Sequence, residues 1–316
     1  IGLEVHVEIK SKSKLFSDSA NSYGMATNTS VNVVDLGYPG TLPTINKEII
    51  RQGIRSCKVL NCNITRKMHF DRKNYFYPDL PKGYQITQQD TPIGYDGYLE
   101  IEVNGKKKKI EIERMHIEED TCKSIHGERG TLLNFNRAGV PLIEIVSKPV
   151  IESPEEAMLY LEKLRETLLY LGISDVKIEE GSMRCDANIS MHEEGEPFGT
   201  KCEIKNIGSI RYVGVSLEYE IKRQTEILER GEKIEREQTR RFDENTNTTV
   251  LMREKETGND YRYFPEPDLP FVTISDAWIE EVKNSMPMMP DEIKEKFVEL
   301  GMNENNIKTL LSNKEI

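Results

Sequence analysis

The chain has 316 residues, of which 37% are hydrophobic and 31% are charged, and its formal net charge is −11 at pH 7. This length allows one large domain or two, and the negative charge argues against a protein that holds nucleic acid by bulk charge alone. No apolar run is long enough to span a membrane, and five cysteines without a CxxC pair fit a reducing compartment, so we expect a cytoplasmic protein with no membrane partner.

Alternation of apolar and polar side chains predicts β-strands in the first half of the chain. The predicted strands cover residues 3–9, 98–103, 109–117 and 140–146. Asn104 and Gly105 separate the second and third of these strands, and this pair of residues favours a tight hairpin turn. We therefore expect these two strands to pair in an antiparallel hairpin.

A helix with clear end signals is predicted over residues 154–171. Ser153 suits the N-cap, Pro154 suits the first helical position, and Glu156 completes a capping box. Gly172 suits the position after the last turn. The apolar stripe of this helix consists of Ala157, Leu161, Leu164, Leu168 and Leu171.

The second half mixes strands, helices and turns. Its predicted elements are strands at residues 182–190 and 199–205, a helix at residues 209–230 and a polar hairpin at residues 239–263. From Ser275 on, short helical segments are interrupted by Pro287 and Pro290. This order predicts an α+β fold with an antiparallel sheet, divided into a main domain over residues 1–285 and the start of a helical domain over residues 286–316. The chain ends within a polar stretch, so we expect the full-length protein to continue beyond it.

The polar residues of the predicted strands share one face of each strand. They are Glu4, His6 and Glu8, then Glu144, then Arg184, Asp186 and Asn188, and finally Lys201, Glu203 and Lys205. A second histidine and three acidic residues lie at the end of another strand, as His116, Glu118, Glu119 and Asp120. If these strands form one sheet, its polar face gathers carboxylates, imidazoles and cations.

Such a face has a functional and an ordinary interpretation. Carboxylates with one or two histidines suit hard divalent ions such as Mg²⁺ or Mn²⁺, and interleaved Lys and Arg suit phosphoryl transfer. The alternative is a solvated sheet face, because any half-exposed antiparallel sheet alternates in this way. Glu144 favours the functional interpretation, since a carboxylate within an apolar strand is costly when it is buried without a partner.

Motifs for other chemistries are missing or ambiguous. No P-loop or GxGxxG motif is present, so a Walker-type or Rossmann nucleotide site is not predicted. Residues 70–79 mix aromatic and charged side chains, which fits either a nucleotide-contacting loop or a packed irregular segment. The proline-rich residues 265–270 predict a rigid connector.

A set of longer stretches is distinctive. They are IGLEVHVE (1–8), DRKNYFYPD (71–79), PKGYQ (81–85), EED (118–120), NRAGVPLIEIV (136–146), RCDANIS (184–190) and DYRYFPEPD (260–268). In this order they closely resemble the B subunits of the glutamyl/aspartyl-tRNA amidotransferases. The matching stretches cover nearly the whole chain, so the resemblance is specific.

The resemblance implies a cradle-like catalytic domain similar to glutamine synthetase, and a ligase that forms carbon–nitrogen bonds with glutamine as amido donor. ATP and Mg²⁺ would phosphorylate the side-chain carboxylate of mischarged glutamyl-tRNA(Gln) or aspartyl-tRNA(Asn), and ammonia would displace the phosphate. The implied partners are the A subunit, an amidase that makes the ammonia, and a small C subunit. The natural tRNA, the number of metal ions, and a bacterial or organellar origin stay open.

The resemblance also assigns site residues. Glu4, His6, Glu119 and Asp186 match the family's metal and kinase site. The alternation argument adds Glu203 to the metal ligands. We therefore expect a Mg²⁺ site on the polar face of the sheet.

Catalytic roles are expected for Glu119, Lys82 and Glu144. The first two match positions at the mouth of the family's ammonia channel, where Glu119 could also take a proton from ammonium, and Glu144 comes from the alternation argument. The nucleotide-binding residues are expected to be Phe198, which matches an adenine-stacking position, together with Lys201, Lys205 and Arg184.

One departure from the family concerns zinc. Many members carry cysteines early in the chain that form a zinc knuckle, whereas residues 16–19 and 32–35 of this chain contain none. We therefore predict no zinc. The rival interpretation of the whole chain is a non-catalytic, tRNA-binding scaffold whose acidic cluster is structural.

Overall fold

The computed structural model of the protein describes residues 1–255 and 260–311. Its helices are α1 (Lys47–Val59), α2 (Pro154–Leu171), α3 (Ile210–Glu229), α4 (Asp276–Asn284), α5 (Pro290–Glu299) and α6 (Glu304–Leu311). The strands of its main sheet are β1 (Gly2–Glu8), β2 (Asn63–Ile64), β6 (Gly94–Val103), β7 (Lys106–Glu119), β10 (Pro141–Ser147), β11 (Met183–Ile189), β12 (Cys202–Lys205), β13 (Glu237–Asp243) and β14 (Thr248–Lys255).

The main sheet has nine strands in the order β14-β13-β12-β11-β1-β10-β7-β6-β2. All neighbouring strands are antiparallel except β12 and β13, which run parallel and are connected through α3. A parallel pair needs such a crossover, because a tight turn reverses the chain. The expected α+β class with a large, mostly antiparallel sheet is thus confirmed, and the likeness to glutamine synthetase stays a prediction.

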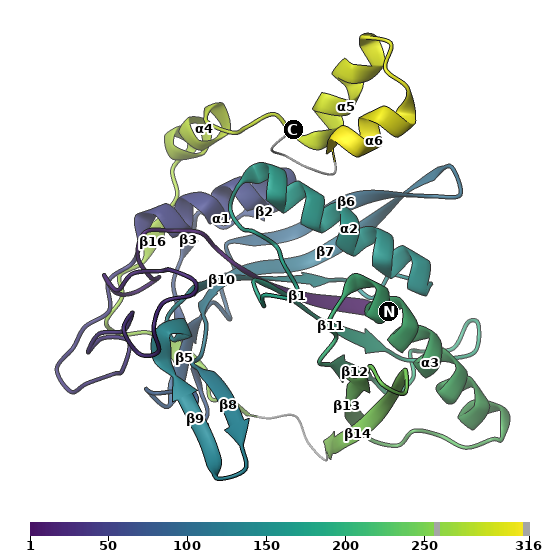
Figure 1. The fold of residues 1–316 in the computed structure, drawn as a ribbon, viewed down its shortest axis with the longest axis horizontal. Helices are drawn as coiled ribbons and strands as arrows, with labels where there is room; N and C mark the ends of the chain where they lie inside the picture. The colour runs from purple at the N-terminus through teal and green to yellow at the C-terminus, as the bar shows by residue number, and fades with distance from the viewer. Residues whose placement is uncertain (256–259, 312–316) are drawn as a thin grey trace.

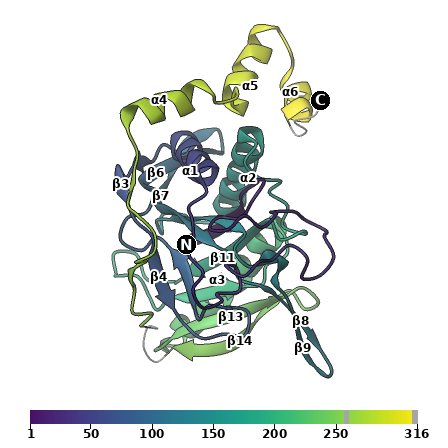
Figure 2. The same ribbon diagram turned by 90° about the vertical axis from the view of Figure 1, so that its left-hand side faces the viewer.

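The helices α1 and α2 cover one face of this sheet (Figures 1 and 2), and α3 packs against α2, β11 and β14. The apolar residues of the central strands are fully buried in the core, as Val5, Val7 and Ile145 show. The predicted stripe of α2 is buried as well. The alternating polar residues therefore lie on the opposite face of the sheet.

The ends of α2 confirm most of the predicted signals. The Ser153 side chain accepts a hydrogen bond from the backbone of Glu156, and Gly172 ends the helix with a left-handed φ of 80°. Glu156 differs from the expected capping box. Its carboxylate accepts a hydrogen bond from the backbone N–H of Glu152 and pairs with Lys108 on β7, so it also ties the helix to the sheet.

The helix α1 was not predicted, although the sequence carries its signals. Asn46 caps its first turn, and Ile50, Ile54 and Cys57 recur at helical spacing and are buried. The strong alternation on both sides of this segment had suggested a strand-rich first half.

Smaller sheets join distant parts of the chain. Their strands are β3 (Lys67–Met68), β4 (Asp71–Asn74), β5 (Tyr84–Thr87), β15 (Phe264–Pro265) and β16 (Val272–Thr273), which form β15-β4-β5 and β16-β3. A bidentate ion pair between Arg72 and Glu266 fastens β4 to the segment after β15. The predicted hairpin over residues 239–263 corresponds to β13 and β14 as far as Lys255, and residues 256–259 of that prediction lie outside the described residues.

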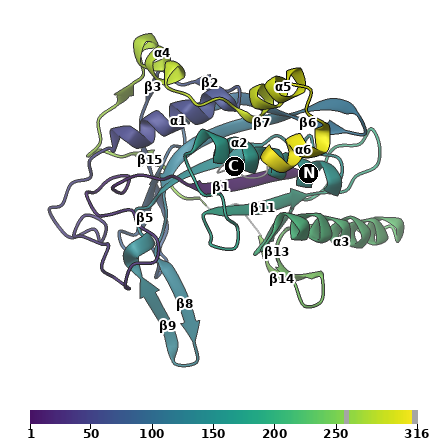
Figure 3. The ribbon, with the colours of Figure 1, turned by 45° about the horizontal axis from the view of Figure 1, so that its top comes forward.

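A further hairpin projects from the main sheet (Figure 3). It consists of β8 (Lys123–Gly127) and β9 (Gly130–Asn134), and a short 3₁₀ helix, η1 (Phe135–Arg137), follows it. Asn28 binds the backbone of Leu133 and Phe135, so the loop before residue 30 supports the base of the hairpin.

The stretch where many relatives of the resembled family carry a zinc knuckle is organised by the carboxylate of Asp35. This carboxylate accepts hydrogen bonds from the hydroxyls of Ser17 and Ser19, both at 2.6 Å, and from the backbone of Asn32. The ammonium of Lys14, which is fully buried, completes the set at 3.2 Å. Residues 14–35 are therefore joined through one buried acidic side chain.

Residues 286–311 form a small group of their own next to α2. Ile307 and Leu311 of α6 are buried with Tyr170, and Phe297 of α5 packs against them. The proposed domain boundary near residue 285 stays a prediction. Among the described residues, no helix has the length and apolar character required to cross a membrane.

Candidate metal centre

The strand register brings the predicted polar residues together. On the polar face, His6 of β1 lies opposite Glu144 of β10 and Arg184 of β11. Glu144 in turn lies opposite His116 of β7. Residues opposite each other on neighbouring strands are in side-chain contact distance, so four strands contribute to one surface.

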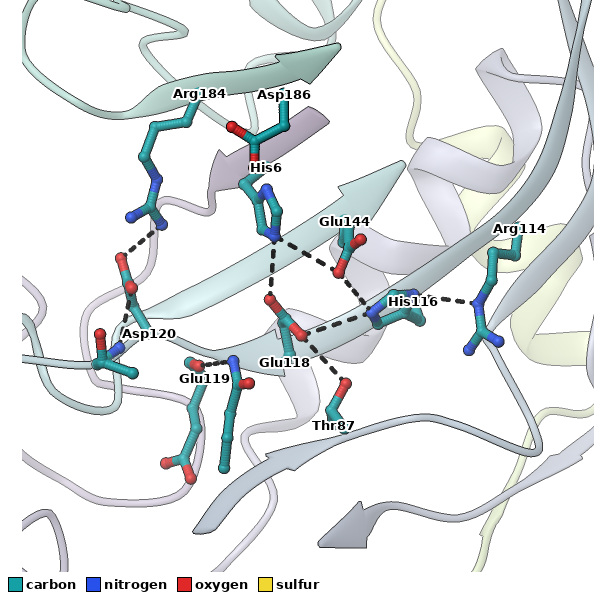
Figure 4. A network of polar contacts seen from close by, with 12 residues as sticks. His6, Thr87, Arg114, His116, Glu118, Glu119, Asp120, Glu144, Arg184 and Asp186 are labelled. Atoms are coloured by element: carbon teal, nitrogen blue, oxygen red, sulfur yellow. Dashed lines mark hydrogen bonds and ion pairs between the residues drawn. The ribbon is translucent and has the colours of Figure 1, made fainter. Parts of the chain in front are cut away.

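The first group on this surface contains two histidines and two carboxylates (Figure 4). His6 Nε2 lies 3.5 Å from Glu118 Oε1 and 3.4 Å from Glu144 Oε2. His116 Nε2 lies 3.0 Å from Glu144 Oε2 and 3.5 Å from Glu118 Oε2. Thr87 of β5 also donates a hydrogen bond to Glu118, which fixes that carboxylate from the side. The cost of burying Glu144 is thus offset by partners, as its place in an apolar strand requires.

The electrostatics of this group favour the charged forms. Burial opposes charge on the imidazoles, but Glu144 and Glu118 raise the pKa of His6 and raise the pKa of His116 to about 9. Burial likewise opposes the charged form of Glu144. The two histidines more than offset this effect of burial and hold the pKa of Glu144 well below its usual range. The group is therefore a compact set of ligands in which a metal ion can take the place of the two imidazole protons.

The second group lies beside the first and contains only carboxylates. Glu4, Asp186 and Glu203 come from β1, β11 and β12, and their oxygens approach within 4.8 Å of one another. Lys205 Nζ lies 2.7 Å from Asp186 and 3.1 Å from Glu203. Burial and the charge of Glu144 raise the pKa of Glu4, although Asn188 donates a hydrogen bond to it.

Both groups fit hard divalent ions. Each offers three ligand atoms within 4.8 Å of one another, and carboxylate oxygen with imidazole is a donor set that Mg²⁺ and Mn²⁺ accept. In the second group, Asn188 Oδ1 is buried and has no hydrogen-bond partner among the described residues, so a further oxygen ligand is free. Glu4 and His6 are two residues apart on one strand face, so the ligands that β1 contributes to the two groups lie about 7 Å apart along the strand.

Glu119 does not join either group. It follows Glu118 directly, so its side chain leaves the strand on the other side, as Figure 4 shows. Lys82 binds both of its carboxylate oxygens, at 2.5 and 2.7 Å, and Ile86 donates a backbone hydrogen bond to it. The structure thus brings Lys82 and Glu119 together, and it separates Glu119 from the other predicted metal ligands.

The predicted nucleotide-binding residues are spread along this surface. Lys205 joins the second group, and Arg184 donates to Asp120 at 2.8 Å. Phe198 and Lys201 lie in the segment between β11 and β12, where Phe198 is 64% exposed and its ring contacts His192. Lys201 is exposed, so the aromatic ring and this lysine are accessible to a ligand.

Three residues of the first group were not predicted from the sequence as metal ligands. Glu118 and His116 were noted as a charged strand end, Glu144 was predicted to be catalytic, and Glu119 was included among the ligands instead. The signal that was not used is the alternation of side chains along a strand, since residues 116 and 118 share one face of β7 and residue 119 lies on the other. The alternation that identified Glu144 would have identified Glu118 too.

A third set of possible ligands has an evident structural use. His69, Asp71 and Asp90 lie together at the start of β4, with His69 Nε2 3.0 Å from Asp71 Oδ1. The other oxygen of Asp71 accepts hydrogen bonds from the backbone of Gln89 and Asp90. This carboxylate holds the turn after β5 in place.

These features define a protein with a carboxylate-rich candidate site for divalent ions on the polar face of a mostly antiparallel sheet. The chain belongs to the GatB/GatE catalytic domain family, whose model matches residues 1–280. It is 56% identical over 319 aligned positions to the B subunit of the aspartyl/glutamyl-tRNA(Asn/Gln) amidotransferase of Geobacillus thermodenitrificans. The B subunits of the same name from Limosilactobacillus reuteri and Enterococcus faecalis are 56% and 54% identical to it. Each match covers all of this chain and 67% of the relative.

Proposed function

We propose that this chain is the part of a tRNA-dependent amidotransferase that activates a side-chain carboxylate with ATP and Mg²⁺. A carboxylate oxygen of the glutamyl or aspartyl group on mischarged tRNA attacks the γ-phosphorus, which forms an acyl phosphate and releases ADP. Ammonia then attacks the acyl carbon, and phosphate leaves. The observation that carries the proposal is the pair of adjacent ligand groups around His6 and Asp186, next to the cations Lys205 and Arg184.

The residues have distinct tasks in this scheme. His6, Glu118 and Glu144 would hold one Mg²⁺, and Glu4, Asp186 and Glu203 would hold another. Bound Mg²⁺ supplies positive charge to the phosphate oxygens and lowers the cost of the charge that builds up during transfer. Lys205 is kept protonated, because Asp186 and Glu203 raise its pKa against the effect of burial, so it can add charge at the same place.

Nucleotide and ammonia would approach from different sides. The exposed ring of Phe198 offers a stacking surface for adenine, and Lys201 in the same segment offers a cation for phosphate. Glu119, oriented by Lys82, is suited to take a proton from ammonium on the other side of β7. An amidase subunit would supply that ammonia, and a small third subunit would complete the assembly.

The test is glutamyl-tRNA-dependent ATP hydrolysis by the full-length assembled enzyme. His6→Ala and Glu118→Gln remove ligands of the first group, and His126→Ala is the matched control, because His126 is exposed on the β8–β9 hairpin. We expect loss of hydrolysis by at least about 100-fold in the first two variants, as for removal of a group that stabilises transferred charge. The control should match the wild type, and the glutaminase activity of the amidase should persist throughout.

The rival proposal, a non-catalytic tRNA-binding scaffold, makes the opposite prediction. Full hydrolysis in both His6→Ala and Glu118→Gln, with normal binding of tRNA, would support the scaffold and overturn the kinase assignment.

A further inference from the structure

Glu8 differs from the other acidic residues on the polar face of β1. Within the described residues, its carboxylate has no hydrogen bond or ion pair, whereas Glu4 binds Asn188. The nearest cation across the strand pair, Arg184, donates instead to Asp120 at 2.8 Å. Glu8 is therefore a half-buried carboxylate that forms no direct ion pair within the described part of the chain, although the charges of Arg184 and Arg137 act on it from a distance and partly oppose the rise of its pKa that burial causes.

The position of Glu8 relates it to the metal ligands. It follows His6 on the same strand face, one repeat of about 7 Å further along β1. It also lines a cleft of about 800 Å³ that reaches Arg184 and Asp186 and extends outward to Tyr23. That volume is within the usual range for small-molecule sites. The cleft thus leads from the surface, past Glu8, to Asp186 of the second ligand group.

The cleft and the proposed adenine position lie at opposite ends of the strands. Glu8 is at the end of β1 that pairs with the start of β11, near Met183. Phe198 lies beyond the other end of β11, which pairs with Gly2. Phosphoryl transfer proceeds with the attacking and leaving oxygens roughly in line, so the acceptor approaches from the side opposite the departing ADP. If the nucleotide lies over Phe198, the cleft beside Glu8 is therefore available to the acceptor.

We infer that Glu8 binds the α-ammonium group of the aminoacyl ester while the side-chain carboxylate of that aminoacyl group lies at His6. In a glutamyl group, the α-nitrogen and the side-chain carboxyl carbon are roughly 5 Å apart by standard bond lengths. That span, extended by the hydrogen bond to Glu8, is long enough to bridge the repeat of about 7 Å between Glu8 and His6 along β1. The esterified end then continues into the cleft toward Tyr23.

This assignment deepens the proposed function and rests on it. It makes Glu8 a binding residue that selects acceptors with a free α-amino group. Arg184 gives its hydrogen bond to Asp120, so no guanidinium hydrogen bond occupies the carboxylate of Glu8 and the ammonium of the substrate can bind it directly.

The test compares two substrates in the assembled full-length enzyme, glutamyl-tRNA and N-acetyl-glutamyl-tRNA, in which the α-nitrogen carries no charge. For the wild type, acetylation should lower kcat/KM for amidation by roughly 10- to 100-fold, the range for a charge-assisted hydrogen bond. Glu8→Gln should lose a similar factor with glutamyl-tRNA and should no longer distinguish the two substrates. The matched control, Glu113→Gln on an exposed position of β7, should discriminate as the wild type does.

Two results would overturn the inference. One is equal amidation of both substrates by the wild type, a measurement that needs no variant to fold. The other is a Glu8→Gln variant that is slower with both substrates by the same factor, as for a purely structural role. Failure of the proposed function gives a different result, because ATP hydrolysis would then persist in His6→Ala. If hydrolysis depends on His6 but amidation is the same with the acetylated substrate, only the Glu8 assignment is contradicted.

Discussion

At the scale of single residues, buried charges on this chain are surrounded by partners. Glu220 of α3 is fully buried, and it binds Arg223 of its own helix, Arg240 of β13 and Thr249 of β14. Burial alone would raise the pKa of Glu220, but these hydrogen bonds and charges lower it below the usual value. One carboxylate therefore connects α3 to two strands of the sheet edge.

Replacing this carboxylate should give a pH-dependent loss of stability. A lowered carboxyl pKa stabilises the folded state above the unfolded pKa, and the gain disappears as pH falls through the folded pKa. Glu220→Gln should therefore cost roughly 3 kcal/mol at pH 7, because it leaves two partly buried guanidiniums without this counter-charge. Denaturant unfolding at pH 7 and near pH 3 checks this. A deficit that is equally large at both pH values would contradict it.

At the scale of elements, the contact between β6 and the end of α1 depends on a missing side chain. A Cβ placed on Gly97 would lie 2.5 Å from the carbonyl oxygen of Leu60 and 2.4 Å from the sulfur of Cys62. The segment after α1 also binds β6 directly, because the backbone of Tyr98 donates to Leu60. The helix and the hairpin strand thus approach each other as closely as the backbone allows.

Gly97→Ala should consequently destabilise the protein by about 1–3 kcal/mol, since the backbone of Leu60 must move. Gly127→Ala is the matched control, because a Cβ there meets only one backbone atom at 3.5 Å. Thermal unfolding of both variants is the measurement. A Gly97→Ala variant as stable as the control would show that α1 shifts without cost.

The elements also show what the sequence could predict. Strands β1, β6, β7, β10 and β11 each contain an alternating stretch, so the apolar faces of these stretches and the helix α2 followed from residue patterns. The order in which the strands pair could not be predicted from these patterns, because β12 and β13 are connected by a crossover and not by a tight turn. The choice between Glu118 and Glu119 required the strand parity from His116, which the family resemblance did not supply. The partner of Asp120, Arg184, lies 64 positions away in the sequence and emerged only from the folded sheet.

At the scale of the whole molecule, negative charge is concentrated where the proposed ions bind. The formal net charge is −11, and six carboxylate or imidazole ligands lie on one sheet face in the groups around His6 and Asp186. Ions that bind the folded state and not the unfolded chain shift the unfolding equilibrium by mass action. Metal binding should therefore be visible in stability as well as in activity.

Mn²⁺ at about 100 times its dissociation constant should stabilise the protein by about 2.7 kcal/mol for each site, and thus raise Tm by several degrees. The combined variant Glu118→Gln, Asp186→Asn should lose most of this rise. NaCl at equal ionic strength is the control for screening. A rise of the same size in the variant or in NaCl would assign the effect to general charge screening.

The buried carboxylate of Asp35 has a consequence for where this fold can be maintained. The stretch that it organises contains hydroxyls, an ammonium and backbone amides, and residues 14–35 include no cysteine. Hydroxyls, an ammonium and backbone amides cannot form a disulfide. The contacts that Asp35 makes therefore stay the same in a reducing and in an oxidising compartment.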